Sequence, residues 1–374
     1  MSIELTLTIS NTHHSTEAGN VRIIAFYLPQ YHPIPENDKW WGKGFTEWTN
    51  VTKAKPLFEG HHQPQLPGEL GFYDLRLPET REAQAALASD HGISGFCYYY
   101  YWFNGKRLLQ RPLEEVLASG KPDFPFCVCW ANENWTRRWD GLNDEILMEQ
   151  IYSESDDRNF IRSLVPLFKD RRYIRVDDRP LLLVYRTELF PNPVRTAQLW
   201  REETREAGLK GLYLVRGEGF AQCEPESIGF DAAYDFPPNG LSSVDLSIDT
   251  ASVAVCRPEE FHCHFYDYRK LVEFMLGKES ATYTRFPTVM VAWDNTARRG
   301  KFSHIFLNST VDCYTNWLLG AIKNASNLSN DRRMVFINAW NEWAEGCHLE
   351  PDQRFGRAYL VATAYAIASV VSRK

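Results

Sequence analysis

The sequence has no excess of basic residues and no long apolar run, and each absence excludes a class of protein. Its 374 residues include 41 Lys and Arg against 48 Asp and Glu, which gives a formal net charge of −7. Nucleic acids and anionic membranes attract cationic surfaces, so neither is expected as the main partner. No run approaches the roughly 18 consecutive apolar residues of a membrane-spanning helix, so no integral membrane segment is expected.

Signals for export and for disulfides are also missing. Residues 1–20 alternate apolar and polar side chains without a basic start, so they are expected to form an N-terminal tail or short strand rather than a signal peptide. The eight cysteines include no C-x-x-C pair, and Cys97, Cys127 and Cys129 lie inside apolar runs that suit small buried thiols. These features favour a reducing, cytoplasmic location.

Several catalytic motifs are absent. The chain has no phosphate-binding G-x-x-x-x-G-K-[ST], no H-E-x-x-H zinc motif and no G-x-S-x-G nucleophile turn. It also lacks the D-x-D pair found in many metal-dependent glycosyltransferases. The histidines at 61–62, 262 and 264 have no second cluster at a fixed spacing, so neither a metal nor another cofactor is expected.

What the chain does contain is a regular alternation of apolar runs and amphipathic stretches, which is typical of parallel β/α units. Strands are expected at 21–28, 92–102, 124–130, 180–186, 212–217, 230–236, 288–293 and 334–340. Helices are expected at 78–92, 111–120, 158–170, 194–208, 266–278, 311–325 and 357–371. Eight strand–helix repeats predict an α/β fold, a single (β/α)8 TIM barrel with long βα loops over residues 21–374.

Two connections are unusually long. About fifty residues separate the first strand from its helix, and such a loop is expected to be ordered and functional. Residues 237–265 resemble an insertion after the sixth strand, and the sequence does not place them in detail. In a TIM barrel both connections open onto the carboxyl ends of the strands, where active sites lie.

Tryptophan gathers at that end of the predicted barrel. Aromatic residues make up 14% of the chain, and ten of its 12 Trp follow or end a predicted strand, whereas Trp200 and Trp317 fall within helices. Indoles offer flat apolar platforms with one N–H donor, which suits the C–H face of a sugar ring. The alternative is that large loops need aromatic anchors to hold them on the barrel rim.

Carboxylates follow the same distribution, and two lie close together after the last strand. Glu342 and Glu345 in "NAWNEWAEG" are three residues apart, a spacing that places both on one side of a helical turn, where each raises the pKa of the other. Glycosidic bond cleavage needs one carboxylic acid and a second carboxylate, and these two are the candidate catalysts. For any single carboxylate, a loop-capping or surface role is about equally expected.

Hydrogen-bonding and aromatic side chains around this mouth are the candidate substrate-binding residues, although His32 is equally suited to a structural hydrogen bond. Arg298 and Arg299 are expected to bind anionic groups or to pair with carboxylates. The full set is Tyr27, Gln30, His32, Trp41, Glu47, Trp48, Tyr99, Trp102, Trp130, Asn132, Glu133, Trp135, Asp294, Trp340, Asn341 and Trp343.

Four segments carry a resemblance to a known family. "AFYLPQYHPIPENDKWWGKGFTEWTNV", "GISGFCYYYYWFNGKRLL", "FCVCWANENWTRRWDG" and "INAWNEWAEGCHLEPD" resemble the WbsX-type family of bacterial surface-polysaccharide proteins, which is related to glycoside hydrolase family 99. The resemblance implies a (β/α)8 barrel that acts on α-linked sugars, with endo-acting, mannose-directed hydrolysis in family 99. By its E-W-x-E-G pattern, Glu342 would assist the sugar 2-hydroxyl and Glu345 would be the acid/base.

The expected function is therefore a retaining α-glycoside hydrolase whose partner is an oligosaccharide or polysaccharide, such as a bacterial surface polysaccharide or its precursor. Ala344 stands where the hydrolases are expected to have histidine, so this chain is not expected to share their substrate in detail. WbsX-type proteins are also labelled glycosyltransferases, so sugar transfer in O-antigen or lipopolysaccharide assembly is the second hypothesis. A sugar-binding barrel without catalysis is the third.

Overall fold

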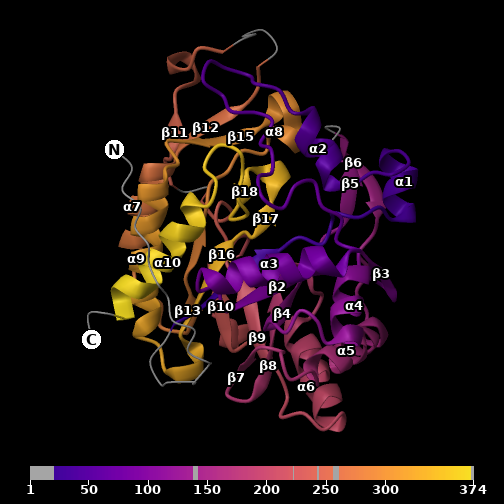
Figure 1. Ribbon diagram of the computed structural model, residues 1–374. Helices are drawn as coiled ribbons and strands as arrows, with labels where there is room; N and C mark the ends of the chain where they lie inside the picture. The colour runs from indigo at the N-terminus through magenta and orange to yellow at the C-terminus, as the bar shows by residue number, and fades with distance from the viewer. Residues whose placement is uncertain (1–20, 138–141, 222, 242–243, 256–260, 372–374) are drawn as a thin grey trace.

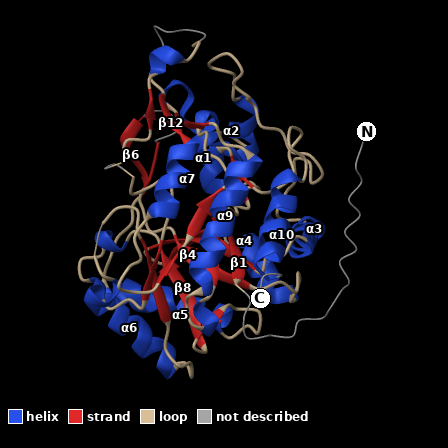
Figure 2. Ribbon diagram, turned by 90° about the vertical axis from the view of Figure 1, so that its left-hand side faces the viewer, coloured by secondary structure: helices blue, strands red, loops and turns tan. Residues whose placement is uncertain are grey.

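The computed structural model describes residues 21–137, 142–221, 223–241, 244–255 and 261–371 (Figure 1). The predicted N-terminal tail, residues 1–20, and Trp139 lie outside the described residues. Strands gather at the centre and helices surround them, as Figure 2 shows.

The core is a nearly closed ring of parallel strands. Each of the eight predicted strands is present, and the seventh is divided at Pro287 into two pieces, of which the first pairs with the sixth strand and the second with the eighth. The carbonyl of Pro287 accepts a hydrogen bond of 2.9 Å from the Phe336 N–H, so the ring stays joined across the break. In order around the ring the strands are β13 (Arg285–Phe286), β10 (Ala232–Tyr234), β9 (Tyr213–Gly217), β8 (Arg179–Val184), β4 (Phe126–Trp130), β2 (Gly95–Phe103), β1 (Arg22–Tyr27), β16 (Met334–Asn338) and β14 (Thr288–Met290).

Aromatic side chains fill the inside of the ring. Phe26 of β1 stacks on Tyr99 of β2 with centroids 5.6 Å apart, and it meets Phe236 edge-on at 5.2 Å and Phe336 at 5.6 Å. Strands buried on both faces read as nearly continuous apolar runs, which is why the sequence located them. Cys97, Cys127 and Cys129 are buried in the strands as unpaired thiols.

Helices cover the outside of the ring where amphipathic segments were predicted. Their ends carry local signals: Ser153 and Thr310 accept hydrogen bonds from the backbone N–H groups of Asp156 and Cys313, and Gly120 ends its helix at a φ of 70°. The helices are α3 (Pro78–Asp90), α4 (Arg111–Ser119), α5 (Glu154–Phe168), α6 (Pro193–Glu206), α7 (Tyr268–Gly277), α9 (Val311–Ser326) and α10 (Ala358–Val371).

One predicted strand–helix repeat differs. The residues described between β9 and β10 contain a single 3₁₀ turn, η3 (Pro225–Ile228), and no α-helix. The segment between the two strands spans only residues 218–231, and a crossover with a full helix needs nearly all of that length for the helix alone. The sequence had offered no helical pattern here, and the expectation of eight complete repeats was wrong at this position.

The two long connections meet above the ring (Figure 1). The loop after β1 is ordered and contains α1 (Pro35–Trp41) and α2 (Glu47–Lys53), and α2 contacts α8 (Thr296–Arg299) and η8 (Trp343–Glu345). The insertion after β10 contains η4 (Thr250–Ser252) and two strands, β11 (Ser247–Ile248) and β12 (His264–Asp267), which form a sheet with β15 (His304–Leu307). Shorter elements are β3 (Lys106–Leu108), β5 (Trp135–Arg137), β6 (Leu142–Met148), β7 (Arg175–Val176), η2 (Thr187–Leu189), η6 (Gly300–Phe302), η7 (Asn330–Arg332), β17 (Asn341–Glu342) and β18 (Cys347–His348).

The small sheet has its own apolar cluster. Phe58 from the first long loop packs edge-on against Phe265 of β12 at 5.1 Å, and Cys263 and Ile305 complete the buried group. An antiparallel bridge between Phe58 and Val255 joins the two long connections directly. Because they fold against each other, these segments form a fixed rim at the carboxyl end of the barrel.

Candidate active site

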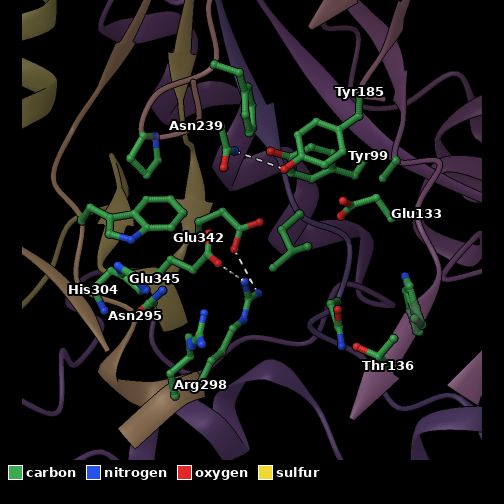
Figure 3. Close-up of a pocket in the computed structure, with 18 of the residues that line it drawn as sticks. Tyr99, Glu133, Thr136, Tyr185, Asn239, Asn295, Arg298, His304, Glu342 and Glu345 are labelled. Carbon is green, nitrogen blue, oxygen red and sulfur yellow. Dashed lines mark hydrogen bonds and ion pairs between the residues drawn. The ribbon is translucent and has the colours of Figure 1, made fainter. Parts of the chain in front are cut away.

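A cavity of about 560 Å³ opens at the carboxyl ends of the strands (Figure 3). Its lining comes from the segments that follow most of the barrel strands and from β2 itself. From β1 to β16 these residues include Leu28, Gln30, Tyr99, Tyr101, Glu133, Tyr185, Phe236, Asn239, Trp293, Asn295, Arg298, Glu342 and Glu345. A cavity of this size and position is where a TIM barrel holds its substrate.

The turn that carries Glu342 and Glu345 is fixed to the first strand. The Asn341 side chain accepts a hydrogen bond of 2.7 Å from the Leu28 N–H and donates one of 3.0 Å to the Leu28 carbonyl. The Tyr31 hydroxyl donates to the Asn341 carbonyl at 2.6 Å. Gly346 ends the turn at a φ of 60°, and a Cβ there would lie 2.7 Å from Nε2 of Gln65. The left-handed conformation therefore favours glycine here, and any larger residue would also have to displace the end of the Gln65 side chain.

Glu350 holds the same turn from below. Its carboxylate is almost fully buried and accepts hydrogen bonds from the Trp343 indole at 2.7 Å, the Tyr73 hydroxyl at 2.7 Å and the Gln84 amide at 2.6 Å. Burial raises the pKa of Glu350 to about 7, while the hydrogen bonds from Trp343 and its other neighbours act in the opposite direction. Glu350 thus anchors the turn and does not line the cavity.

Arg298 joins three carboxylates. Its Nη2 lies 3.0 Å from Glu342, its Nη1 lies 2.8 Å from Glu345, and its Nε lies 2.8 Å from Glu47. The Arg298 side chain is 12% exposed, and that of Glu47 is fully buried. Glu342 and Glu345 approach the two terminal nitrogens of one guanidinium, so their carboxyl groups are neighbours at the cavity wall (Figure 3).

Burial and charge around Arg298 favour a bound proton on its carboxyl partners. Burial raises the pKa of Glu342 to about 8 against the pull of Arg298, and the charges of Glu345 and Glu47 raise it further. Burial also raises the pKa of Glu345, again opposed by Arg298. Three carboxylates around one guanidinium leave two negative charges uncompensated, and one bound proton reduces this excess to a single charge. A pair of carboxyl groups that shares a proton near neutral pH can act as acid and base.

Polar side chains occupy both sides of the cavity (Figure 3). Beside Glu345, the His304 imidazole shares a hydrogen bond of 2.9 Å with the Tyr266 hydroxyl, and burial lowers the pKa of His304 to about 4. Across the cavity, Asn239 donates to the Tyr185 hydroxyl at 3.2 Å, and Glu133 forms an ion pair with Arg186. A neutral imidazole, an amide and two phenols suit the hydroxyl groups of a sugar.

The structure brings seven of the predicted site residues to this cavity. Trp135 is held edge-on by Tyr101 at 5.1 Å, and Trp41 lines the cavity from the end of α1. Trp293, which was counted among the strand-end indoles, lines it as well. The seven are Gln30, Trp41, Tyr99, Glu133, Trp135, Glu342 and Glu345.

Three predicted indoles support the rim and do not line the cavity. The Trp48 N–H donates to the Tyr73 carbonyl at 2.9 Å, the Trp102 N–H reaches both oxygens of Asp156 at 3.0 Å, and Trp343 binds Glu350. The N–H group of each of these three indoles therefore donates to an oxygen of the protein. The remaining predicted residues outside the cavity lining are Tyr27, His32, Glu47, Trp130, Asn132, Asp294, Trp340 and Asn341, all of them buried.

Two of these buried residues connect loops that do line the cavity. Asn132 accepts from the Arg186 N–H at 2.8 Å and donates to the Arg186 carbonyl at 2.8 Å. Asp294 binds His61 and Gln63 at 2.7 Å each beside a smaller cavity of about 240 Å³, and its N–H donates to the Glu345 carbonyl at 2.7 Å. Asn132 and Asp294 therefore act through the segments they hold.

Several cavity residues were not singled out from the sequence. Tyr185 lies near the end of the strand predicted at 180–186 and directly after β8, so it could have been found by the same strand-end rule as the tryptophans. Asn239, Tyr266 and His304 come from the insertion and from β15, whose pairing had no signal in the sequence. Within the described residues, no group of three or more His, Cys, Asp or Glu side chains is arranged to hold a metal ion. No helix among those residues is long and apolar enough to cross a membrane.

Comparisons with known proteins agree with this architecture. Residues 23–363 match the model of the family described as glycosyltransferase WbsX. Two proteins named WxcX, from two strains of Xanthomonas campestris pv. campestris, are each 48% identical over 346 residues, which is 92% of this chain. The chain spans about half the length of these curated relatives, 49% of each.

Solved structures share the fold. A family 99 endo-α-mannosidase from Bacteroides thetaiotaomicron superposes with a TM-score of 0.58 at 16% identity, covering 94% of this chain and 98% of that one. A structure described as a glycoside hydrolase-like protein gives 0.58 at 14% identity, covering 96% and 97%. At such identities the likeness concerns the barrel fold alone.

Proposed function

The chain belongs to the WbsX glycosyltransferase family, and we propose that it is a carbohydrate-active enzyme that cleaves α-glycosidic bonds with retention through Glu342 and Glu345. The observation that carries this proposal is a buried glutamate, Glu342, and a partly exposed one, Glu345, bound to one guanidinium at the wall of a large cavity. Glycoside hydrolysis requires two such carboxyl groups on either side of the reacting bond. The pKa of Glu342, raised to about 8 by burial, keeps a proton on the pair near neutral pH, and burial raises the pKa of Glu345 as well.

The exposure of the two side chains supports different roles. The Glu342 side chain is 7% exposed and that of Glu345 is 22% exposed. Glu345 is the better placed to meet both the leaving oxygen and an incoming water, so it is the acid and then the base. Glu342 lies deeper, where it accepts the proton of the sugar 2-hydroxyl, the role that the resemblance to family 99 implies.

In this mechanism the 2-oxygen attacks the anomeric carbon while Glu342 takes its proton and Glu345 protonates the departing oxygen. Water then opens the resulting three-membered ring: Glu345 removes a proton from the water, and Glu342 returns its proton to the 2-oxygen. Two inversions give net retention, and both glutamates end as they began. Arg298 opposes the effect of burial on the pKa of Glu342, which still stays raised to about 8. The mechanism therefore requires the proton that the two carboxyl groups share to lie on Glu345 when Glu342 acts as the base.

For the substrate we propose a bacterial surface polysaccharide or its precursor, cut within the chain in the manner of the family 99 endo-α-mannosidases. The family relation supports the polysaccharide. The indoles of Trp41, Trp135 and Trp293 line a cavity that extends well beyond the glutamates and suits several sugar rings.

The test is a screen of purified protein against O-antigen and mannan-type oligosaccharides, with the anomers of the products followed by NMR. Glu342→Gln and Glu345→Gln should each lower kcat by at least about a hundredfold, since each removes a proton-transfer group. Glu279→Gln, at an exposed position after α7, is the matched control. Full activity of either cavity variant, or an inverted product, would end this proposal.

Sugar transfer from an activated donor is the second candidate, and the description of the matching family is the observation that favours it. A donor complex should raise the midpoint of thermal unfolding at saturating nucleotide sugar. Stabilisation by a nucleotide sugar, together with formation of a new glycosidic bond, would replace hydrolysis as the assigned activity.

A further inference from the structure

Five apolar side chains line the cavity from the segment after β10, the insertion and β15. This apolar wall consists of Phe236, Leu241, Val244, Leu246 and Phe306, all of which line the cavity. The first follows β10, the next three belong to the insertion, and the last lies on β15. The wall therefore comes from the segment whose structure the sequence did not predict.

Backbone hydrogen bonds hold the wall in place. The Leu246 carbonyl accepts from the Asp267 N–H of β12 at 2.8 Å, which ties the insertion to the small sheet. The N–H groups of Leu246 and Val244 donate to the carbonyls of Val244 and Leu241, each at 3.0 Å. Leu246 is 3% exposed and Phe306 is 6% exposed, so both present a surface that is already largely desolvated.

The wall also lies next to the proposed catalytic turn. The Phe306 N–H donates to the Trp293 carbonyl at 2.8 Å, and the N–H of the following residue, Asp294, donates to the Glu345 carbonyl at 2.7 Å. Two backbone hydrogen bonds thus connect the wall to the glutamate turn. A sugar ring bound between the glutamates and this wall presents some of its substituents to hydrocarbon.

The five wall side chains themselves offer hydroxyl groups no hydrogen-bonding partner; Tyr266, which stacks on Phe306 at 5.0 Å, and His304 line the same cavity and supply the polar contacts beside the wall. A buried hydroxyl without a hydrogen bond loses its hydration and gains nothing in return. Leucine and valine also lack the flat face on which an indole stacks a sugar ring. A methyl group, by contrast, gains from burial against such side chains.

From this arrangement we propose that the ring bound beside the glutamates carries a methyl group directed at the apolar wall. Two sugar classes supply one: a 6-deoxyhexose, through its C6 methyl, and an acetamido sugar, through its acetyl methyl. The inference rests on the proposed function, because it places a sugar ring at Glu342 and Glu345. It goes beyond that function in stating which sugars the cavity prefers.

Binding to the Glu342→Gln variant tests the preference without turnover. Methyl α-glycosides are compared in pairs by NMR titration: 6-deoxymannose with mannose in the D and L series, 6-deoxygalactose with galactose, and N-acetylglucosamine with glucose. The methyl-bearing member should bind roughly tenfold or more tightly in at least one pair, as expected when a hydrophobic site meets an added hydroxyl. The pair that shows the difference identifies the sugar class.

Two substitutions in the wall test its role. Leu241→Asn changes a half-buried position, and Leu246→Asn changes a buried one. Because each supplies a hydrogen-bonding group to the wall, either should reduce the preference for the methyl-bearing sugar to about twofold or less. Leu147→Asn is the matched control, because Leu147 lines the same cavity from β6 and not from the apolar wall. It should leave the ratio of the two affinities unchanged.

The outcomes separate this inference from the proposed function. Equal binding of both members in every pair, with Glu342-dependent hydrolysis intact, would overturn the methyl preference alone. An unchanged preference in folded Leu241→Asn would also overturn it, since the wall would then not be its source. Failure of every sugar to bind, together with no cleavage in the oligosaccharide screen, would overturn both.

Discussion

Replacing Glu342 with glutamine should stabilise the fold at alkaline pH, although the same change is expected to abolish activity. Burial raises the pKa of Glu342 from its ordinary value of 4.5 to about 8. Between these values the native protein holds a proton that the unfolded chain releases. The free energy of unfolding therefore falls as pH rises through this window, and it stays low above pH 8.

The magnitude follows from the charges around Arg298. Each unit of pKa shift corresponds to about 1.4 kcal/mol, so an isolated shift of this size would cost about 5 kcal/mol above pH 8. Glu342 and Glu345 share their environment, and Arg298 keeps Glu345 and Glu47 as partners after the substitution, so only part of the cost is recovered. We expect Glu342→Gln to gain about 2 kcal/mol at pH 9 and to match the parent near pH 5, where both bear a neutral side chain.

Urea unfolding at pH 5 and pH 9, followed by tryptophan fluorescence, measures this difference. The exposed Glu279→Gln variant should show the same small change at both pH values. A Glu342→Gln variant that is less stable than the parent at pH 9, or equally shifted at both pH values, would show that the buried carboxylates carry no excess negative charge. Glu342 and Glu345 would then not share a proton at neutral pH.

Three further predictions concern the same turn. The kcat/KM of the parent should fall as pH rises above about 8, where the carboxyl pair loses its last proton, and a pH–rate profile on any cleaved substrate measures this. Because Arg298 lowers the pKa of both glutamates, Arg298→Met should move that alkaline limb to higher pH, and a limb at the same or lower pH would contradict the assignment. Asn341→Ala leaves the buried N–H and carbonyl of Leu28 without partners, so it should cost about 2–4 kcal/mol in urea unfolding, whereas Asn324→Ala on the exposed side of α9 should change stability by less than about 0.5 kcal/mol.

The sequence predicted the helices and strands well where the local pattern of residues matches the burial of the element in the folded chain. The strand at 334–340 is an apolar run because β16 is buried on both faces, and the helix at 311–325 shows its cap at Thr310. The same rules gave no sign that β12 pairs in parallel with β15, about forty residues later. Such pairing depends on which edges the folded chain brings together, and no local periodicity encodes it.

For the site, the sequence alone determined that Glu342 and Glu345 follow the last strand on one short turn, because position along a β/α repeat decides which face of the barrel a residue reaches. It also showed that tryptophan gathers at that face. Only the tertiary structure decided which indoles line the cavity, since the direction of a side chain depends on acceptors such as Glu350 and Asp156 from distant segments. It likewise decided that Arg298 binds both glutamates from α8. Arg298 and Glu342 are 44 positions apart, and they meet only when the eighth strand lies beside the seventh.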